Sequence, residues 1–120
     1  MADSHDYGRI AEHLAARSLE GHGWTILDRN FRCGHKEIDL VARRGDTVAF
    51  VEVKARATRT FGHPLDAITA HKRREITTVA RAWIARNGRP AYSYRFDAIW
   101  IIGRPGARIQ LDHVPGAWRL

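Results

Sequence analysis

The chain has 120 residues, a net charge of +7 and 44% hydrophobic residues, which is the size and composition of one globular domain spanning residues 1–120. No window approaches the 18 or more apolar residues of a membrane span, and the polar N-terminus lacks the apolar core of a signal peptide. Cys33 is the single cysteine, which excludes an intrachain disulfide. These features argue against membrane insertion and predict a cytoplasmic location.

The predicted elements follow the order αβββαββ. A first helix begins at a cap on Asp3 or Ser4 and ends at Gly21. Strands follow at residues 24–32, 37–42 and 47–55, and a second helix ends at Asn87 and Gly88. Residues 92–102 form a strand buried on both faces, and residues 108–114 form a more exposed one. The apolar positions at helical spacing are Tyr7, Ile10, Ala11 and Leu14 in the first helix, and Ile68, Ile76, Val79, Ala80, Trp83 and Ile84 in the second.

Charged residues interrupt the two strands at 37–42 and 47–55. Because side chains alternate along a strand, Glu37 and Asp39 are expected on one face, with Ile38, Leu40 and Ala42 on the other. The same alternation places Glu52 and Lys54 together on one face.

The turn between these strands determines whether the charged faces meet. Gly45 and Asp46 suit the centre of a type II′ turn, which has glycine at its first central position. This turn places Asp39 opposite Glu52 and Glu37 opposite Lys54. The hairpin therefore gathers three carboxylates and one ammonium group.

Carboxylates crowded on half-buried strands repel one another and lose hydration, so they favour a bound cation. Hard oxygen ligands suit Mg²⁺ or Mn²⁺, which activates water for phosphodiester hydrolysis, while a partly desolvated lysine orients or deprotonates that water. The alternative is a cross-strand charge cluster that faces solvent.

Positive charge is concentrated in one segment. Residues 54–95 carry ten Lys/Arg and two Asp/Glu, whereas residues 1–53 carry seven and nine. Such segregation is typical of a surface that binds a nucleic acid backbone, although a well-solvated surface could have the same composition. The basic residues of the segment are Lys54, Arg56, Arg59, Lys72, Arg73, Arg74, Arg81, Arg86, Arg89 and Arg95.

The order of these motifs resembles a known family. Asp39 precedes Glu52-Val53-Lys54 on a hairpin that lies between a helix bearing Glu12 and a basic helix. With the further matches at Gly8, Ala15, Arg29-Asn30, residues 37–40 and 50–56, Phe61-Gly62, Lys72 and residues 95–97, the chain resembles the YraN-like family of bacterial proteins. These are predicted endonucleases of the PD-(D/E)XK superfamily, distantly similar to archaeal Holliday junction resolvases.

The resemblance implies an α/β fold with a restriction-endonuclease-like core, in which helices flank a mixed sheet. It implies Asp39 and Glu52 as metal ligands, with the Val53 carbonyl, and Lys54 as the catalytic lysine. Glu12 falls where related resolvases carry a helix carboxylate. Glu37, which the predicted hairpin places on the same face as Asp39, is a further candidate metal ligand. Two departures are Ile38, where the superfamily motif has proline, and Lys36, where family members commonly have glycine.

The nucleic-acid contacts expected from the basic segment are Arg56, Arg59, Lys72, Arg73 and Arg74. Asp97 beside Arg95 is interpreted as a buried structural carboxylate. The predicted function is a metal-dependent endonuclease acting on DNA, including branched or flapped DNA. The alternatives are a catalytically silent DNA-binding module in recombination, repair or DNA uptake, and an RNA-binding protein; a homodimer is left open.

Overall fold

The computed structural model describes residues 4–56, 68–104 and 106–119. They form two helices and one five-stranded mixed sheet, with the strands in the order β1-β2-β3-β4-β5. Only β3 and β4 pair in parallel. The element order αβββαββ is the order that the sequence predicts. The elements are α1 Ser4–Gly21, β1 Thr25–Cys33, β2 Lys36–Arg44, β3 Thr47–Arg56, α2 Ala70–Asn87, β4 Ser93–Ile102 and β5 Gln110–Trp118.

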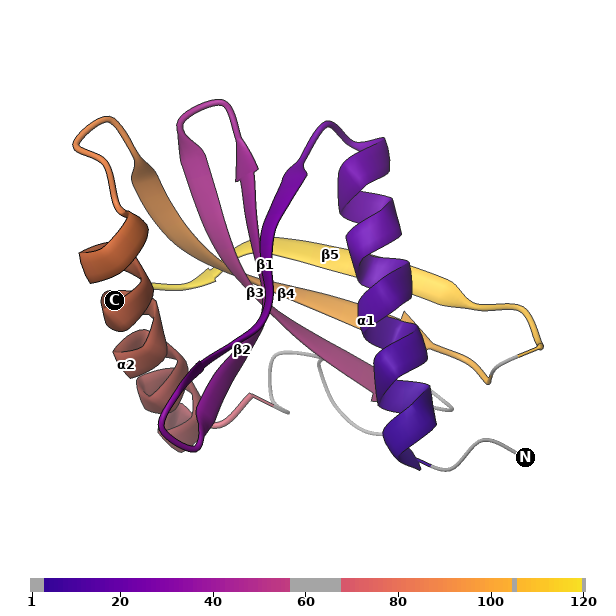
Figure 1. Cartoon of the computed structure of the whole chain (residues 1–120). Helices are drawn as coiled ribbons and strands as arrows, with labels where there is room; N and C mark the ends of the chain where they lie inside the picture. The colour runs from indigo at the N-terminus through magenta and orange to yellow at the C-terminus, as the bar shows by residue number, and fades with distance from the viewer. Residues whose placement is uncertain (1–3, 57–67, 105, 120) are drawn as a thin grey trace.

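The sheet separates the two helices, with α1 on one face and α2 on the other (Figure 1). The face of α1 that packs on the sheet is small, consisting of Ala11, Ala15, Ala16 and Leu19, so the helix can approach the strands closely. Ile10, which shares the helical spacing of these residues in the sequence, is 38% exposed and is not part of the buried face. Within the described ranges, neither helix is long and apolar enough to cross a membrane.

Helix α2 has well-defined ends. The Thr69 side chain accepts a hydrogen bond from the Lys72 N–H at 3.1 Å, and this N-cap begins the helix at Ala70. Gly88 ends it by donating its N–H to the Ile84 carbonyl at 2.8 Å, where a Cβ atom would collide with that oxygen. The end at Gly88 confirms the prediction, but Ile68 precedes the helix and is buried in the core without being helical.

The register of the β2–β3 hairpin is the one that the turn predicts. Arg44 pairs with Thr47, and Leu40 pairs with Val51. Gly45 has φ +61 and is the one residue of the turn with positive φ, as a type II′ turn requires.

The alternation of side chains between the two faces of the sheet is interrupted at Asp39. The prediction that Ile38 shares a face with Leu40 and Ala42 is therefore wrong. Ile38 packs in the cluster on the α2 side of the sheet, whereas Leu40 and Ala42 pack in the cluster on the α1 side. The ladder between β2 and β3 ends at Leu40 and Val51, so neither predicted pairing, Asp39 with Glu52 or Glu37 with Lys54, is part of it. Beyond that point β2 pairs only with β1, and β3 pairs only with β4. The two strands therefore separate at Asp39.

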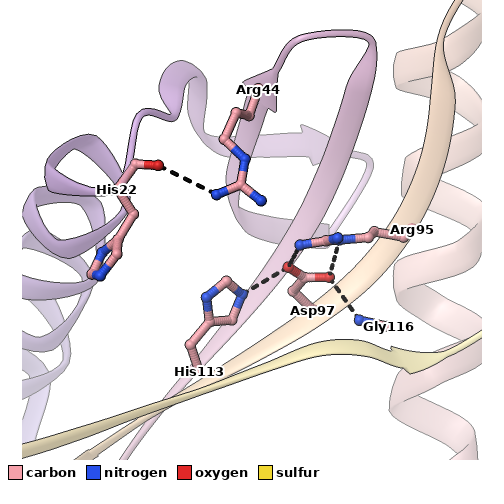
Figure 2. Close-up of polar contacts among 6 residues, drawn as sticks. All are labelled: His22, Arg44, Arg95, Asp97, His113 and Gly116. Atoms are coloured by element: carbon pink, nitrogen blue, oxygen red, sulfur yellow. Dashed lines mark hydrogen bonds and ion pairs between the residues drawn. The ribbon is translucent and has the colours of Figure 1, made fainter.

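Asp97 joins β4 to β5 through a buried ionic network (Figure 2). Its carboxylate is 0% exposed and accepts bonds from Arg95 Nε at 3.0 Å, His113 Nε2 at 2.7 Å and Gly116 N–H at 3.0 Å. Burial raises the pKa of Asp97, but the donated hydrogen bonds outweigh burial and hold the pKa below its usual value. The buried, hydrogen-bonded carboxylate predicted from the sequence is confirmed.

Asp97→Asn should lower the free energy of unfolding by about 3 kcal/mol at pH 7, because it removes one partner of a buried ion pair. A carboxylate whose folded pKa is depressed contributes stability above its unfolded pKa and loses it as the pH falls through the folded value. The difference between wild type and variant in urea unfolding should therefore shrink in acid. A difference that stayed constant from pH 7 to pH 3 would contradict this account.

Candidate metal and nucleic-acid site

Asp39 stands where β2 and β3 separate. Its Oδ2 accepts a hydrogen bond from the Val53 N–H at 2.7 Å, in place of the ladder bond that the diverging strands no longer form. The side chain therefore holds β3 at a fixed position relative to β2. The carbonyl of Val53, which the family resemblance implies as a metal ligand, stays a prediction.

Three carboxylates from two elements form the acidic cluster. Glu12 of α1 and Glu37 and Asp39 of β2 each place one oxygen so that all three lie within 4.8 Å of one another. All three side chains are partly buried. The cluster brings Glu12, which the sequence connects to the hairpin only through family resemblance, into direct proximity with the hairpin carboxylates.

Asn30 of β1 is a component of the site that sequence reasoning gave no role. Its Nδ2 donates to both carboxylate oxygens of Glu12, at 3.3 and 3.2 Å, and to Glu37 Oε1 at 3.0 Å. With φ 52, Asn30 is the sole non-glycine residue in the described ranges that has positive φ. Asparagine is one of the few residue types that adopt this conformation readily. The pairs on either side, Arg29 with Leu40 and Phe31 with Ile38, place Asn30 opposite Asp39.

Glu52 and Lys54 of β3 lie beside the acidic cluster. Glu52 is only 4% exposed, and its Oε1 lies 3.7 Å from the Lys54 Nζ. Its other oxygen, Oε2, is buried and has no hydrogen-bond partner in the part of the chain that the structure describes. Glu52 is not one of the three residues whose oxygens all lie within 4.8 Å of one another, but its charge raises the pKa of Asp39 more than the charges of Glu12 and Glu37 do, so it belongs to the same group of carboxylates.

The electrostatics of the site leave negative charge uncompensated. Burial raises the pKa of Asp39 well above its usual value, the charges of Glu52, Glu12 and Glu37 raise it further, and the Val53 N–H opposes them. Burial also raises the pKa of Glu52, against the charges of Lys72 and Lys54. Both shifts have the direction expected where buried carboxylates crowd together.

The donor set suits a hard divalent cation. Every side chain that converges here offers carboxylate oxygen, the ligand type that Mg²⁺ and Mn²⁺ prefer. The buried Glu52 Oε2 without a partner is an independent sign, since a buried charged oxygen ordinarily has one. Asp39 is common to both possible groupings, the acidic cluster and the Asp39–Glu52 pair.

The acidic cluster is reached from two grooves. One contains Glu37 and Asp39 and has a basic and polar rim. The other contains Glu12 and Asn30 and lies against α1. The first is lined by Arg32, Gly34, His35, Lys36, Glu37, Asp39, Lys72 and Glu75, and the second by Arg9, Glu12, His13, Arg29, Asn30 and Leu40. Lys36, the departure from the family pattern, thus adds positive charge to the rim of the first groove.

The structure places the predicted nucleic-acid contacts at different locations. Lys72 lines the first groove, and Arg74 is exposed on the same helix. Arg73 instead donates from Nε to the Ile68 carbonyl at 3.1 Å and lies over the Trp118 ring, 5.6 Å from its centroid. Arg56 lies over Trp100 at the far end of β3. Arg59 lies outside the described residues. Lys72 is therefore the predicted contact that joins the candidate site.

Comparison with known proteins gives a consistent family match. The model of the uncharacterised protein family UPF0102 matches residues 11–101. A UPF0102 protein of Myxococcus xanthus is 39% identical over 117 residues, covering 98% of this chain and 92% of the relative. A second, from Geobacter metallireducens, is 43% identical over 113 residues, covering 94% and 92%. A third, from Chlorobium chlorochromatii, is 47% identical over 96 residues, covering 80% and 74%.

Asn30→Asp tests whether the amide holds the acidic cluster together. Aspartate has nearly the same size and tolerates positive φ, but it replaces a donor with an acceptor beside Glu12 and Glu37. The variant should lose about 1–3 kcal/mol of unfolding free energy in EDTA, measured by urea denaturation.

Asn30→Gly is the matched variant, since it keeps the backbone conformation and removes the amide without adding charge. It should be less destabilised than Asn30→Asp. An Asn30→Asp protein as stable as wild type would show that the two hydrogen-bonded carboxylates do not depend on the amide.

Proposed function

The chain belongs to the uncharacterised protein family UPF0102, the YraN-like family that its motifs predict, and we propose that it is a metal-dependent endonuclease that hydrolyses DNA phosphodiester bonds. The observation that carries the proposal is the convergence of Glu12, Glu37 and Asp39 within 4.8 Å, beside the buried Glu52 and Lys54. The same arrangement supports assignment to the PD-(D/E)XK superfamily, with a restriction-endonuclease-like core.

The metal ligands in this proposal are carboxylates around Asp39. Glu12 and Glu37 are close enough to share one Mg²⁺ or Mn²⁺ with it, and Glu52 offers its unpartnered Oε2 from the adjacent strand. When bound, such an ion stabilises negative charge on phosphate oxygens and lowers the pKa of a coordinated water. It would also neutralise the repulsion that raises the pKa of Asp39.

Lys54 is the proposed catalytic lysine. Its Nζ lies 3.7 Å from Glu52, and its side chain is 26% exposed, so it is held near the carboxylates and still reaches solvent. An ammonium group in this position can orient the attacking water or donate to a phosphate oxygen. Its attachment to β3, next to the strand residue that binds Asp39, fixes its distance from the site.

Nucleic acid is the proposed substrate because basic side chains line the same groove as the carboxylates Glu37 and Asp39. Arg32, Lys36 and Lys72 line the groove that contains Glu37 and Asp39. Positive charge at the rim can hold the flanking phosphates, whereas carboxylates alone would repel them. The proposed substrate is DNA, including branched or flapped DNA, and the proposed location is the cytoplasm. The competing function is a nucleic-acid-binding module that does not cleave. The competing ligand is RNA.

Substitutions in the hairpin should separate metal binding from catalysis. Asp39→Asn and Glu52→Gln keep side-chain size but remove ligand charge, so each should weaken Mn²⁺ binding in calorimetry and abolish cleavage. Lys54→Ala should still bind Mn²⁺, and its cleavage rate should fall by at least about 100-fold. Cleavage is measured on duplex, single-stranded, flap and four-way junction DNA in Mg²⁺ and in Mn²⁺.

The stability of Asp39→Asn provides the internal control for folding. In EDTA it should be at least as stable as wild type, because it removes a charge that burial and neighbouring carboxylates disfavour. A wild-type protein that binds DNA but neither binds Mn²⁺ nor cuts any of these substrates would support the binding-module alternative and overturn the nuclease proposal.

Lys72→Ala should weaken DNA binding across sequences, because a contact with the phosphate backbone carries no base specificity. The dependence of log affinity on log salt concentration should become shallower by about one unit. Arg81→Ala is the matched control, since Arg81 is exposed on the same helix and does not line the groove. Equal salt slopes for wild type and Lys72→Ala, measured by fluorescence anisotropy in EDTA, would remove Lys72 from the interface.

A further inference from the structure

A second pocket, separate from the acidic cluster, lies beside the end of α1. Its charged or titratable side chains come from four parts of the chain: His22 follows α1, Arg44 ends β2, Arg95 belongs to β4 and His113 to β5. We call these four residues the cationic pocket; Figure 2 shows them around one space. None of the residues that line it lines either groove at the acidic cluster.

Asp97 fixes two members of the cationic pocket. Both Nε and Nη2 of Arg95 donate to its carboxylate, at 3.0 and 3.1 Å, so the guanidinium plane is held by two bonds. His113 Nε2 bonds to the same carboxylate at 2.7 Å, which leaves Nδ1 for another partner. The buried aspartate thus orients a guanidinium and an imidazole that both line the pocket.

Arg44 brings positive charge that no neighbouring carboxylate balances. Its Nη1 donates to the His22 carbonyl at 3.3 Å, and its guanidinium lies 4.6 Å from the centroid of the Trp24 ring. Arg95 lies over the same ring at 5.1 Å. Among the described residues, Arg44 forms no ion pair, so the two guanidinium groups of the cationic pocket face one carboxylate, Asp97, which is buried and does not line the pocket.

The end of α1 does not cancel this charge. The last carbonyls of a helix ordinarily carry partial negative charge. Here the Leu19 carbonyl accepts the N–H groups of His22 and Trp24 at 3.0 Å, and the Glu20 carbonyl accepts the Gly23 N–H at 3.1 Å. The Ser18 carbonyl accepts from His22 Nδ1 at 2.7 Å. Because these oxygens are already hydrogen-bonded, an anion at the pocket meets mainly donors.

We propose that the cationic pocket binds the phosphate monoester of a nucleotide. Arg44 and the remaining Nη1 of Arg95, whose Nε and Nη2 are bonded to Asp97, offer guanidinium N–H donors that match the several oxygens of a terminal phosphate. Leu111 and Pro115 line the same pocket and offer apolar contact to the attached sugar or base. The ligand is either the phosphorylated end of a nucleic acid strand or a free nucleotide; the chemistry at the pocket is the same for both.

The test compares 5′-phosphorylated with 5′-hydroxyl single-stranded oligonucleotides of one sequence, by calorimetry in EDTA. Wild type should bind the phosphorylated strand about tenfold more tightly, the difference expected for charge-assisted hydrogen bonds. Arg44→Gln should abolish the preference. Arg43→Gln is the matched control, because Arg43 is the adjacent residue and lies over Tyr92, 6.0 Å from its ring centroid, outside the pocket.

A nucleoside 5′-monophosphate added to the complex with the phosphorylated strand distinguishes the two sources: it should displace the strand if a free nucleotide is the ligand, and fail to displace it if the strand end is required. Glu52→Gln should keep the preference for the phosphorylated strand, which separates this proposal from the nuclease proposal. Equal binding of both strands by wild type, or an unchanged preference in an Arg44→Gln protein with wild-type melting temperature, would overturn it.

Discussion

The hydrogen bond from the Val53 N–H to Asp39 is the interaction on which the candidate site depends. It joins β2 and β3 at the point where their ladder ends. It extends the connection between the strands one step beyond the last ladder pair, Leu40 with Val51, to the carboxylates of β2 and to Glu52 and Lys54 of β3. Beyond the ladder, Glu37 and Asp39 of β2 lie close to Glu12 of α1, which completes the acidic cluster. One side-chain-to-backbone bond therefore links strand separation to the assembly of the site.

The acidic cluster and the cationic pocket contrast in how their charges are balanced. At the cationic pocket, Asp97 is buried but receives enough hydrogen bonds to lower its pKa. At the acidic cluster, Asp39 receives one backbone bond, while burial and then three neighbouring carboxylates raise its pKa. The proposed metal ion would supply at Asp39 the compensation that Asp97 receives from its hydrogen-bond donors. This difference is the physical basis for the structural role of Asp97 and for the metal-binding role that we propose for Asp39.

The sequence predicts the order of the elements and the register of the hairpin because both depend on local chemistry. Gly45 determines the turn, and Gly88 ends α2 because a side chain would collide there. The change of face at Asp39 was not predictable from alternation, since it depends on strand separation and on the backbone conformation of Asn30. An asparagine inside a strand, opposite an aspartate, was the available signal, because asparagine tolerates positive φ. Arg73 could not be separated from Lys72 by sequence, because only packing shows that it turns toward Trp118.

Anomalous diffraction from crystals soaked in MnCl₂ tests the central claim most directly, since it locates manganese independently of any activity. The account predicts one anomalous peak bounded by Glu12, Glu37 and Asp39, with Glu52 on its β3 side. It also predicts that the peak disappears in Asp39→Asn crystals of the same form. A peak at another location, or ordered unliganded carboxylates at saturating manganese, would contradict it.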